Sequence, residues 1–325
     1  MYKIYLGVDI GGTDVKIGLI TSDGNLIKST AFSVDFDHYK TPIIDTVLKS
    51  IDIFLENNNL DSNNLIGIGI SATGQIDTYS GTVIGSAGHI DNWIYTPIKD
   101  IVQNKYAVPV SVANDANCAV IGEYWKGSAV NYSNVIMITI GTGIGGGIIC
   151  NGKVLSGKIG LAGELGHFSI DKSGKKCTCG NFGCYEQYAS TTTLVNNVNE
   201  LLNSLPSYPI NKTEKINGKF IFEQVKLGNS DITYIVNKWI DDISVGLVGL
   251  IHIFNPDLVI IGGGVSSQEA YFITPLRNKV FSMIMPSFKR HLKITSANLG
   301  NNAGLIGAIY NLIKDNNLGG IFDNW

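Results

Sequence analysis

Three apolar stretches of the sequence each end in a cluster of glycines, and this pattern limits the fold more than any other feature. The clusters are Gly11–Gly12, Gly141–Gly147 and Gly262–Gly264. A short apolar run before a glycine cluster predicts a strand followed by a tight turn, where exposed backbone amides can cradle phosphate oxygens. One such turn alone is more simply explained by a plain hairpin, but three in one chain favour a nucleotide site. The sequence contains no G-x-x-x-x-G-K-[ST] motif, which excludes the P-loop class.

The first two turns also resemble each other. Val8-Asp9-Ile10-Gly11-Gly12-Thr13 and Ile138-Thr139-Ile140-Gly141-Thr142-Gly143 share a strand, a glycine turn and a hydroxyl residue, so we expect two related halves. Around these turns the periodicity predicts an antiparallel meander over residues 3–34, further strands over 65–70, 108–113, 135–140 and 258–261, and helices over 41–57, 116–125, 232–254 and 303–314.

Length and composition narrow the class of protein. The chain has 325 residues, of which 44% are hydrophobic and 16% charged, so it is long enough for about two well-buried domains. A net charge of −3 gives no electrostatic reason to bind nucleic acid. No apolar run reaches the roughly 18 residues that span a bilayer, and the N-terminus lacks a secretory pattern. We therefore expect a cytoplasmic protein with no membrane partner.

The most specific feature is a histidine followed by three closely spaced cysteines. The four residues are His167, Cys177, Cys179 and Cys184. Zinc binds such Cys3His sets in tetrahedral structural sites, and glycines between the cysteines allow the tight turn that chelation requires. Buried free thiols are the alternative interpretation. Because four protein ligands leave no position for a catalytic water, the sequence predicts a structural zinc ion.

Several carboxylates lie beside these motifs. Asp9 ends an apolar strand, where it could bind the magnesium ion of a nucleotide or cap the turn amides. Asp115 stands at a helix start, where an ordinary N-cap is the simpler interpretation, but with Asn114 it could accept a sugar hydroxyl proton. Glu164 and Glu186 flank the Cys3His set, so a metal-tied loop could aim them at sugar hydroxyls, although solvated surface acids are the alternative.

These motifs together resemble the ROK family of sugar kinases and regulators. Residues 6–16 look like its first phosphate motif, 139–147 like its second, and 258–266 like its adenosine motif. Residues 163–167 and 177–186 are similar to the family signature with its zinc site. The resemblance covers nearly the whole chain.

The resemblance implies an α/β protein with the actin-like ATPase (ribonuclease H-like) fold, in which two α/β domains enclose a central cleft. We expect an N-terminal domain over 1–115, completed by the C-terminal helix 303–325, and a C-terminal domain over 116–302 that carries the zinc loop. The resemblance also implies a homodimer that uses ATP, Mg²⁺ and structural Zn²⁺ to phosphorylate a hexose.

Residue by residue, the resemblance makes Asp115 the catalytic base. The implied sugar ligands are Asn114, Asp115, Glu164, His167 and Glu186. The implied nucleotide-binding residues are Asp9, Gly11, Gly12, Thr13, Lys16, Thr142, Gly143, Gly262, Gly263 and Gly264. The implied metal ligands are His167, Cys177, Cys179 and Cys184 for zinc and Asp9 for magnesium. His167 would then serve both zinc and sugar.

Two segments depart from the family pattern, and both belong to regions that shape the family's sugar pocket. Ser71–Asp77 lacks the usual proline before its glycine, and Gly88–Trp93 lacks the usual Asn, Pro and Gly before its tryptophan. The leading substrate is glucose, giving glucose 6-phosphate, with N-acetylmannosamine, N-acetylglucosamine, another hexose or a β-glucoside as alternatives. The family also contains sugar-sensing repressors with a DNA-binding domain ahead of this fold. Because the first strand here begins at Lys3, we favour the kinase.

Overall fold

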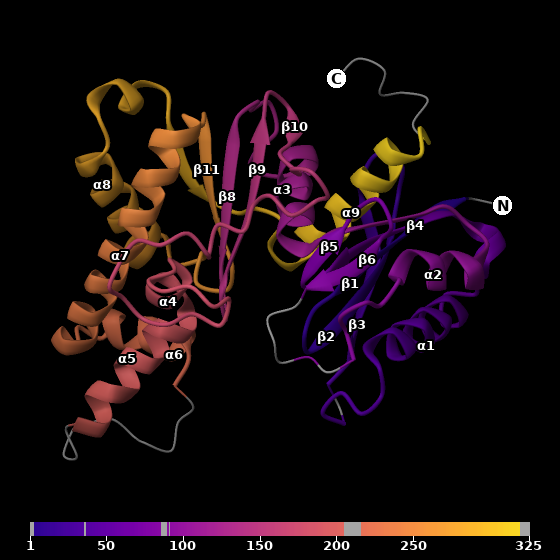
Figure 1. The fold of residues 1–325 in the computed structure, drawn as a ribbon, viewed down its shortest axis with the longest axis horizontal. Coiled ribbons are helices and arrows are strands. Elements are labelled where there is room, and N and C mark those ends of the chain that lie inside the picture. The colour runs from indigo at the N-terminus through magenta and orange to yellow at the C-terminus, as the bar shows by residue number, and fades with distance from the viewer. Residues whose placement is uncertain (1–2, 36, 86–89, 91, 205–215, 319–325) are drawn as a thin grey trace. The chain divides into compact units, whose positions relative to one another are not determined.

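The computed structural model describes residues 3–35, 37–85, 90, 92–204 and 216–318. Contacts among them divide the chain into two compact units (Figure 1). The first unit draws its residues from 1–131, 147–163 and 298–325, and the second from 132–146 and 164–297.

The first unit is built on a five-stranded sheet with the strand order β3-β2-β1-β4-β7. Its strands are β1 (Ile4–Ile10), β2 (Asp14–Ile20), β3 (Leu26–Ser33), β4 (Leu65–Ala72) and β7 (Val110–Asn114). The first three are antiparallel, which confirms the predicted meander, whereas β4 and β7 run parallel to β1. The carboxyl ends of β1, β4 and β7 therefore meet at one edge of the sheet, where the first glycine turn lies.

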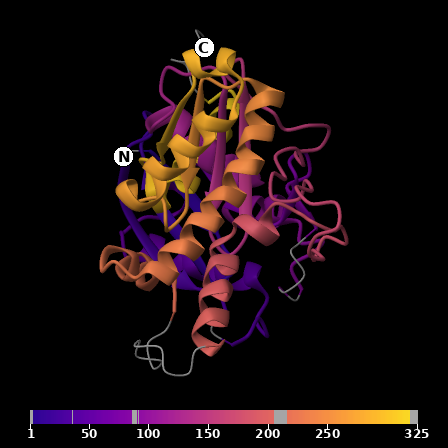
Figure 2. The same cartoon turned by 90° about the vertical axis from the view of Figure 1, so that its left-hand side faces the viewer.

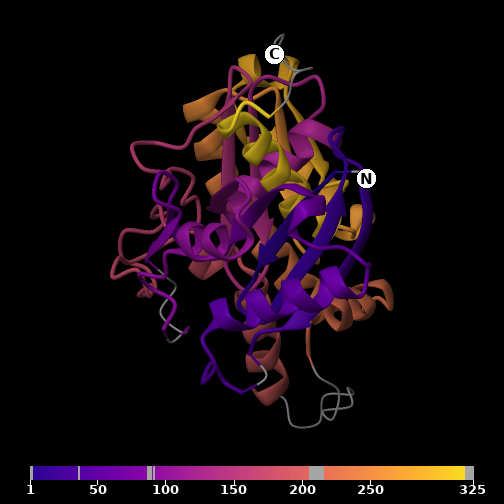
Figure 3. The ribbon, with the colours of Figure 1, turned by 90° about the vertical axis from the view of Figure 1, so that its right-hand side faces the viewer.

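Helices cover both faces of this sheet (Figure 1 and Figure 3). On one face α1 (Ile43–Glu56) and α2 (Ile98–Tyr106) bury their apolar sides in a core shared with all five strands. On the other face α9 (Ala303–Asp315) packs through Leu305 and Ile309 against β1 and β2. The most C-terminal described helix thus covers one face of a sheet whose first strand is near the N-terminus.

A second helix, α3 (Asp115–Lys126), crosses α9 at very short range. A Cβ atom on Gly307 of α9 would lie 1.8 Å from the carbonyl oxygen of Cys118 in α3, so only glycine permits this approach. Residues 116–131, which we expected in the second domain, consequently lie in the first unit. The long-range packing of α3 on α9 is not visible in local periodicity.

A second five-stranded sheet, whose strands lie mostly in the second unit, has the order β10-β9-β8-β11-β12, which repeats the order of the first sheet. Its strands are β8 (Val135–Ile140), β9 (Ile144–Cys150), β10 (Lys153–Val154), β11 (Leu258–Gly262) and β12 (Lys293–Ser296). The strands β8, β11 and β12 are parallel, as are β1, β4 and β7 in the first sheet. The division between the two units falls within β9.

The second glycine turn is shorter than predicted. Only Gly141–Gly143 form the turn, because β9 already includes Gly145–Gly147. These strand glycines have a packing role, since a Cβ atom on Gly146 would lie 2.4 Å from the side chain of Leu165. Sequence alone cannot separate a glycine required by a turn from one required by a close neighbour.

The remaining elements are shorter, apart from one long helix. The second unit contains α4 (Glu186–Ala189), α5 (Thr191–Ser204), α6 (Gly218–Lys226), α7 (Ser230–Phe254) and α8 (Thr274–Met283), and the first contains a hairpin of β5 (Gln75–Asp77) and β6 (Thr82–Gly85). Figure 2 shows α7 as the long orange helix in front. Among the described helices, none combines the length and apolarity needed to cross a membrane.

Candidate active site

The structure brings the predicted Cys3His set together. One ligand atom from each of His167, Cys177, Cys179 and Cys184 lies within 4.8 Å of the others. The Sγ atom of Cys177 is 3.6 Å from Nδ1 of His167, and the Sγ atoms of Cys179 and Cys184 are 3.5 Å apart. Ligands at zinc–donor distances of about 2.0–2.3 Å would be separated by roughly 3.3–3.8 Å in a tetrahedron. The donor set therefore fits a zinc ion.

The loop around these residues is shaped for chelation. Gly180, with a φ of +93°, donates its N–H to the carbonyl of Cys177 at 3.1 Å and turns the chain back on itself. Burial alone would raise the pKa of Cys177, but hydrogen bonds with Cys179, His167 and Cys184 lower it to about 7. Burial and hydrogen bonds with the other two thiols raise the pKa of Cys184 to about 12. A bound cation would favour the thiolate form of all three.

Both predicted glutamates flank the metal loop, which is the segment 167–184 that contains the four donors. The exposed Glu164 accepts a backbone hydrogen bond from His167 at 3.1 Å through its carbonyl. Glu186 follows Cys184 by two positions, and its Oε2 accepts the N–H of Ile144 at 3.0 Å, at the end of the second glycine turn. No local sequence pattern predicts this contact between a predicted sugar ligand and a predicted phosphate turn.

The second and third glycine clusters lie side by side. A Cβ atom on Gly263 would lie 2.1 Å from the carbonyl oxygen of Ile140, so the turn after β11 rests on the end of β8. The structure thus brings Gly262 and Gly263 beside the end of β8, from which the turn that contains Thr142 and Gly143 continues. Backbone amides at the carboxyl ends of adjacent parallel strands are suited to hold a phosphate-bearing ligand.

Two helix starts that the sequence analysis missed join these turns. Thr191, at the start of α5, donates its N–H to the carbonyl of Gly141 at 2.9 Å, and Thr192 donates its hydroxyl to the carbonyl of Thr142 at 2.8 Å. Gly218, at the start of α6, lies against Val265, which a Cβ atom there would approach to 2.9 Å. A run of hydroxyl residues before an apolar helical pattern was the available signal.

In the first unit, Asp9 is packed beneath the first glycine turn. Its Oδ1 accepts the hydroxyl of Ser71, and a Cβ atom on Gly304 would lie 2.8 Å from the same oxygen. Burial raises the pKa of Asp9, and the Ser71 hydrogen bond and the charge of Lys16 only partly offset this effect. A cation beside Asp9 would lower the cost of burying its charge, so the residue fits a magnesium ligand.

The other residues of the first phosphate motif have partners within the unit. Lys16 donates from Nζ to the carbonyl of Asn301 at 3.1 Å and to Oδ1 of Asn302, just before α9. The carbonyl of Gly12 accepts the hydroxyl of Tyr39 at 2.6 Å. The Tyr39 contact holds the first turn, and the Lys16 contacts connect β2 to the segment before α9. The sequence pattern indicated neither Tyr39 nor the two asparagines.

Asn114 and Asp115 divide the roles expected at the start of α3. Asn114 is the N-cap, because its Oδ1 accepts the N–H groups of Ala116 and Asn117 at 2.9 and 3.2 Å. Its Nδ2 donates to Oδ1 of Asp115 at 2.9 Å and to the carbonyl of Gly74 at 3.0 Å. The Asn114 amide therefore orients the Asp115 carboxylate.

The predicted sugar ligands come from both units. Asn114 and Asp115 belong to the first unit, whereas Glu164, His167 and Glu186 belong to the second. Of the two departing segments, Ser71–Asp77 contacts Asn114 through Gly74. In the other segment, Gly88–Trp93, three residues (Gly88, His89 and Asp91) fall outside the described residues.

Comparisons with known proteins identify the family of this chain. The ROK family model matches residues 5–315. The chain is 34% identical to a glucokinase of Thermotoga maritima over 95% of this chain and 97% of that protein. It is 29% identical to a xylose repressor of Caldicellulosiruptor bescii, over 95% of this chain and 78% of the repressor. A solved ROK family glucokinase from Streptomyces griseus, in complex with glucose and AMPPNP, is 32% identical with a TM-score of 0.81, over 94% of this chain and 97% of that structure.

Proposed function

Because this chain belongs to the ROK family and has the actin-like ATPase fold, we propose that it is an ATP-dependent sugar kinase whose preferred reaction converts glucose to glucose 6-phosphate. The observation that carries the proposal is the 34% identity to a glucokinase over 97% of that protein. The relative of known structure that binds glucose and AMPPNP supports the same reaction. The local geometry of each unit supplies the residue types that this chemistry requires.

In the proposed reaction Asp115 acts as general base. Its carboxylate accepts the proton of the sugar hydroxyl while that oxygen forms a bond to the γ-phosphorus of ATP. The bond between the γ-phosphorus and the bridging oxygen breaks, and ADP leaves with its electron pair. The Asn114 amide, 2.9 Å from Oδ1 of Asp115, keeps the carboxylate in a fixed orientation.

The remaining residues bind and orient the two substrates. Glu164, His167, Glu186 and Asn114 hold the sugar hydroxyls, and the glycine turns hold the nucleotide phosphates through backbone amides. Magnesium, bound near Asp9, would supply positive charge to neutralise the phosphates. Zinc, held by His167 and the three cysteines, would fix the loop that carries the sugar ligands without taking part in the chemistry.

The choice of glucose among the possible sugars is a separate part of the proposal. Other hexoses, N-acetylmannosamine, N-acetylglucosamine and β-glucosides use the same kinds of hydrogen bond, so the substrate panel must decide among them. A site that hydrogen-bonds a given hydroxyl rejects an analogue lacking it by up to about 10⁴- to 10⁵-fold. A sugar-sensing regulator is the second candidate, supported by the 29% identity to a xylose repressor.

The test is ADP release by the purified protein with ATP, Mg²⁺ and each of six sugars: glucose, mannose, fructose, N-acetylglucosamine, N-acetylmannosamine and a β-glucoside. We expect the highest kcat/KM with glucose. A higher kcat/KM with an N-acetylated sugar would show that glucose is not the preferred substrate, and the assignment as a sugar kinase would stand. No ADP release with any sugar would contradict the kinase and favour the regulator.

We further propose that the enzyme works as a homodimer in the cytoplasm, without nucleic-acid or membrane partners. The family resemblance supports the dimer, and the net charge of −3 supports the absence of nucleic acid. Light scattering at micromolar concentrations should give about twice the chain mass of 35.0 kDa. A monomer at all of these concentrations would contradict the dimer.

A further inference from the structure

The second glycine turn is held in place by the chain segment that directly follows the metal loop. Three hydrogen bonds connect them: Ile144 N–H to Glu186 Oε2 at 3.0 Å, Thr191 N–H to Gly141 O at 2.9 Å, and Thr192 Oγ1–H to Thr142 O at 2.8 Å. These bonds reach both sides of the turn. Its position is therefore set largely by residues 186–192.

The segment that follows Cys184 and leads to Thr191 is itself firmly held by hydrogen bonds. The buried Tyr185 donates its N–H to the carbonyl of Phe168 at 2.9 Å and its hydroxyl to the carbonyl of Ile243 at 2.8 Å. Trp239 donates its indole N–H to the carbonyls of Ala189 and Ser190 at 3.0 and 3.1 Å. Because residues 185–192 are short and firmly held, a displacement of the metal loop would also displace the turn.

The packing at this junction leaves no room for an independent adjustment of the turn. A Cβ atom on Gly143 would lie 2.1 Å from Oε2 of Glu186, and one on Gly166 would lie 2.4 Å from the carbonyl oxygen of Ile144. The side chain of Glu186 therefore packs against Gly143, and the backbone at Gly166, directly before the metal loop, packs against the backbone of Ile144. Tightly packed interfaces of this kind transmit strain, because they cannot deform continuously.

We propose that the metal loop positions the nucleotide turn through Glu186 and Thr192, so that the metal ion controls nucleotide affinity as well as the sugar ligands. The inference rests on the proposed function, which places the ATP phosphates at this turn. Thr192 is a positioning residue in this scheme: its hydroxyl holds the carbonyl of Thr142, and the N–H groups of the turn hold the phosphates. The expected consequence is a loss of nucleotide affinity when either the metal or the Thr192 hydroxyl is removed.

The first test is Thr192→Val, which keeps the shape of the side chain and removes the donated hydrogen. Thr192 is exposed, so the fold should survive. Loss of one hydrogen bond of ordinary strength predicts a threefold to tenfold higher Kd, roughly, for a non-hydrolysable ATP analogue in calorimetry. The KM for the hexose should stay unchanged, and Thr192→Ser, which keeps the hydroxyl, should restore the wild-type Kd.

The matched control is Thr274→Val in the same unit. Thr274 donates its hydroxyl to Oε1 of Glu269 at 3.0 Å, at the start of α8, and has no contact with the turn. This variant should bind the analogue like the wild type. Equal Kd values for Thr192→Val and wild type, or equal losses in Thr192→Val and Thr274→Val, would overturn the inference.

The second test removes the metal with a chelator and measures analogue binding without turnover. The Kd should rise in the wild type and rise by a smaller factor in Thr192→Val, because this variant already lacks the hydrogen bond to the carbonyl of Thr142. Equal factors in both proteins would show that the metal does not act through Thr192. A wild-type protein that shows these binding effects but phosphorylates no hexose would contradict the proposed function and leave this inference standing.

Discussion

At the scale of single residues, the proposed zinc site depends on four side chains that lie close to one another. The Sγ atom of Cys177 and Nδ1 of His167 are 3.6 Å apart, which is within hydrogen-bond distance for a thiol. A bound zinc ion would displace the thiol protons and join the four donors in one rigid site. The metal loop between Glu164 and Glu186 would then be held in a single geometry.

The zinc prediction follows from this donor set. Protein purified without added metal should contain about one zinc ion per chain in elemental analysis. Cys177→Ser should lose most of that zinc, whereas Cys150→Ser, a cysteine of β9 outside the set, should keep it. Fully active wild-type protein without metal, or equal zinc loss in both variants, would contradict the site.

The start of α3 illustrates how far local sequence can predict a site. The neighbouring Asn114 and Asp115 were both identified from sequence, but the ordinary N-cap role was assigned to Asp115, whereas in the structure Asn114 is the N-cap. Asn and Asp are equally good N-caps, so propensity cannot choose between them. The choice depends on the carbonyl of Gly74, forty residues away, which binds the Asn114 amide at 3.0 Å.

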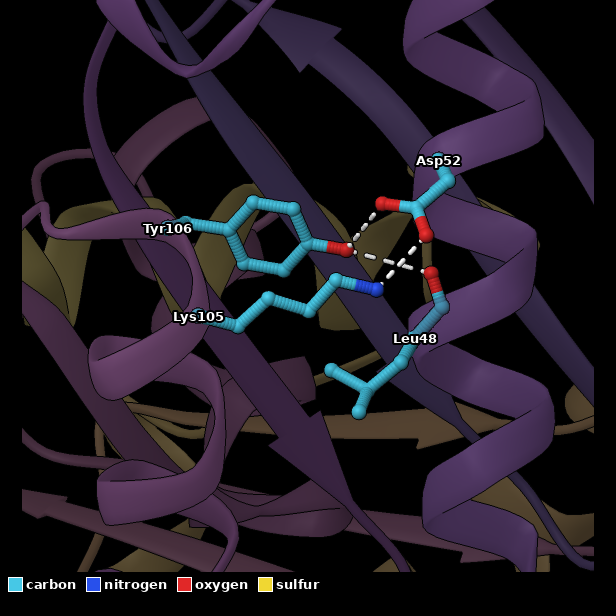
Figure 4. Close-up of polar contacts among 4 residues, drawn as sticks. All are labelled: Leu48, Asp52, Lys105 and Tyr106. Carbon is cyan, nitrogen blue, oxygen red and sulfur yellow. Dashed lines mark hydrogen bonds and ion pairs between the residues drawn. The ribbon is translucent and has the colours of Figure 1, made fainter.

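At the scale of secondary-structure elements, helix pairs fix the first unit by two different means. On one face, Tyr106 of α2 donates its hydroxyl to the carbonyl of Leu48 at 3.1 Å and to Oδ1 of Asp52 at 2.9 Å in α1 (Figure 4). Lys105 adds an ion pair with Asp52. On the other face, α3 and α9 make direct backbone contact at Gly307.

The Tyr106 contact has a pH dependence of known sign. Burial, together with the hydrogen bond and charge of Asp52, raises the pKa of Tyr106 well above its ordinary value. The neutral hydroxyl therefore stabilises the fold fully below about pH 10, and the contribution falls as the pH rises further. Tyr106→Phe should lower the free energy of unfolding in urea by about 1 kcal/mol at pH 7, and the difference from wild type should shrink above pH 10.

Tyr234→Phe is the matched control, because its ring is 60% exposed on α7. It should leave the free energy of unfolding unchanged at both pH values. If the difference between Tyr106→Phe and wild type grew above pH 10, the direction of the pKa shift would be wrong.

Two helix glycines, one at the α3–α9 crossing and one in α7, should change the free energy of unfolding in opposite directions when each is replaced by alanine. Gly307→Ala places a Cβ atom 1.8 Å from the carbonyl of Cys118 and should destabilise the protein by about 1–3 kcal/mol or more. Gly249→Ala in α7 meets nothing within 4 Å and should stabilise it by up to about 1 kcal/mol. Urea denaturation measures both, and a Gly307→Ala protein as stable as wild type would contradict the close approach.

The elements that the sequence predicted best are those with strong local patterns. The antiparallel strands before Val34 and the helix 232–254 depend on apolar periodicity, and the structure contains both. The contacts that position the second turn were missed, because they join Thr191 and Thr192 to a turn about fifty residues earlier. Periodicity reports which face of an element is buried, and it does not report the partner.

At the scale of the whole molecule, the two sheets have the same strand order, in agreement with the repeat predicted from the two glycine turns. Each unit contributes a different part of the proposed chemistry. The first contains the base Asp115 and its orienting amide, and the second contains the metal loop with Glu164, His167 and Glu186. Neither unit alone carries a complete set of catalytic and sugar-binding residues, so the central claim concerns the whole chain.

The measurement that tests this claim most directly is the turnover of Asp115→Asn with saturating glucose, ATP and Mg²⁺. Asparagine keeps the size of the side chain and can still accept the N–H of Ala116, which lies 2.8 Å from Oδ1, so the fold and glucose binding should persist. Loss of the general base should lower kcat by roughly 10²- to 10⁴-fold. Near wild-type turnover in this variant would contradict the account.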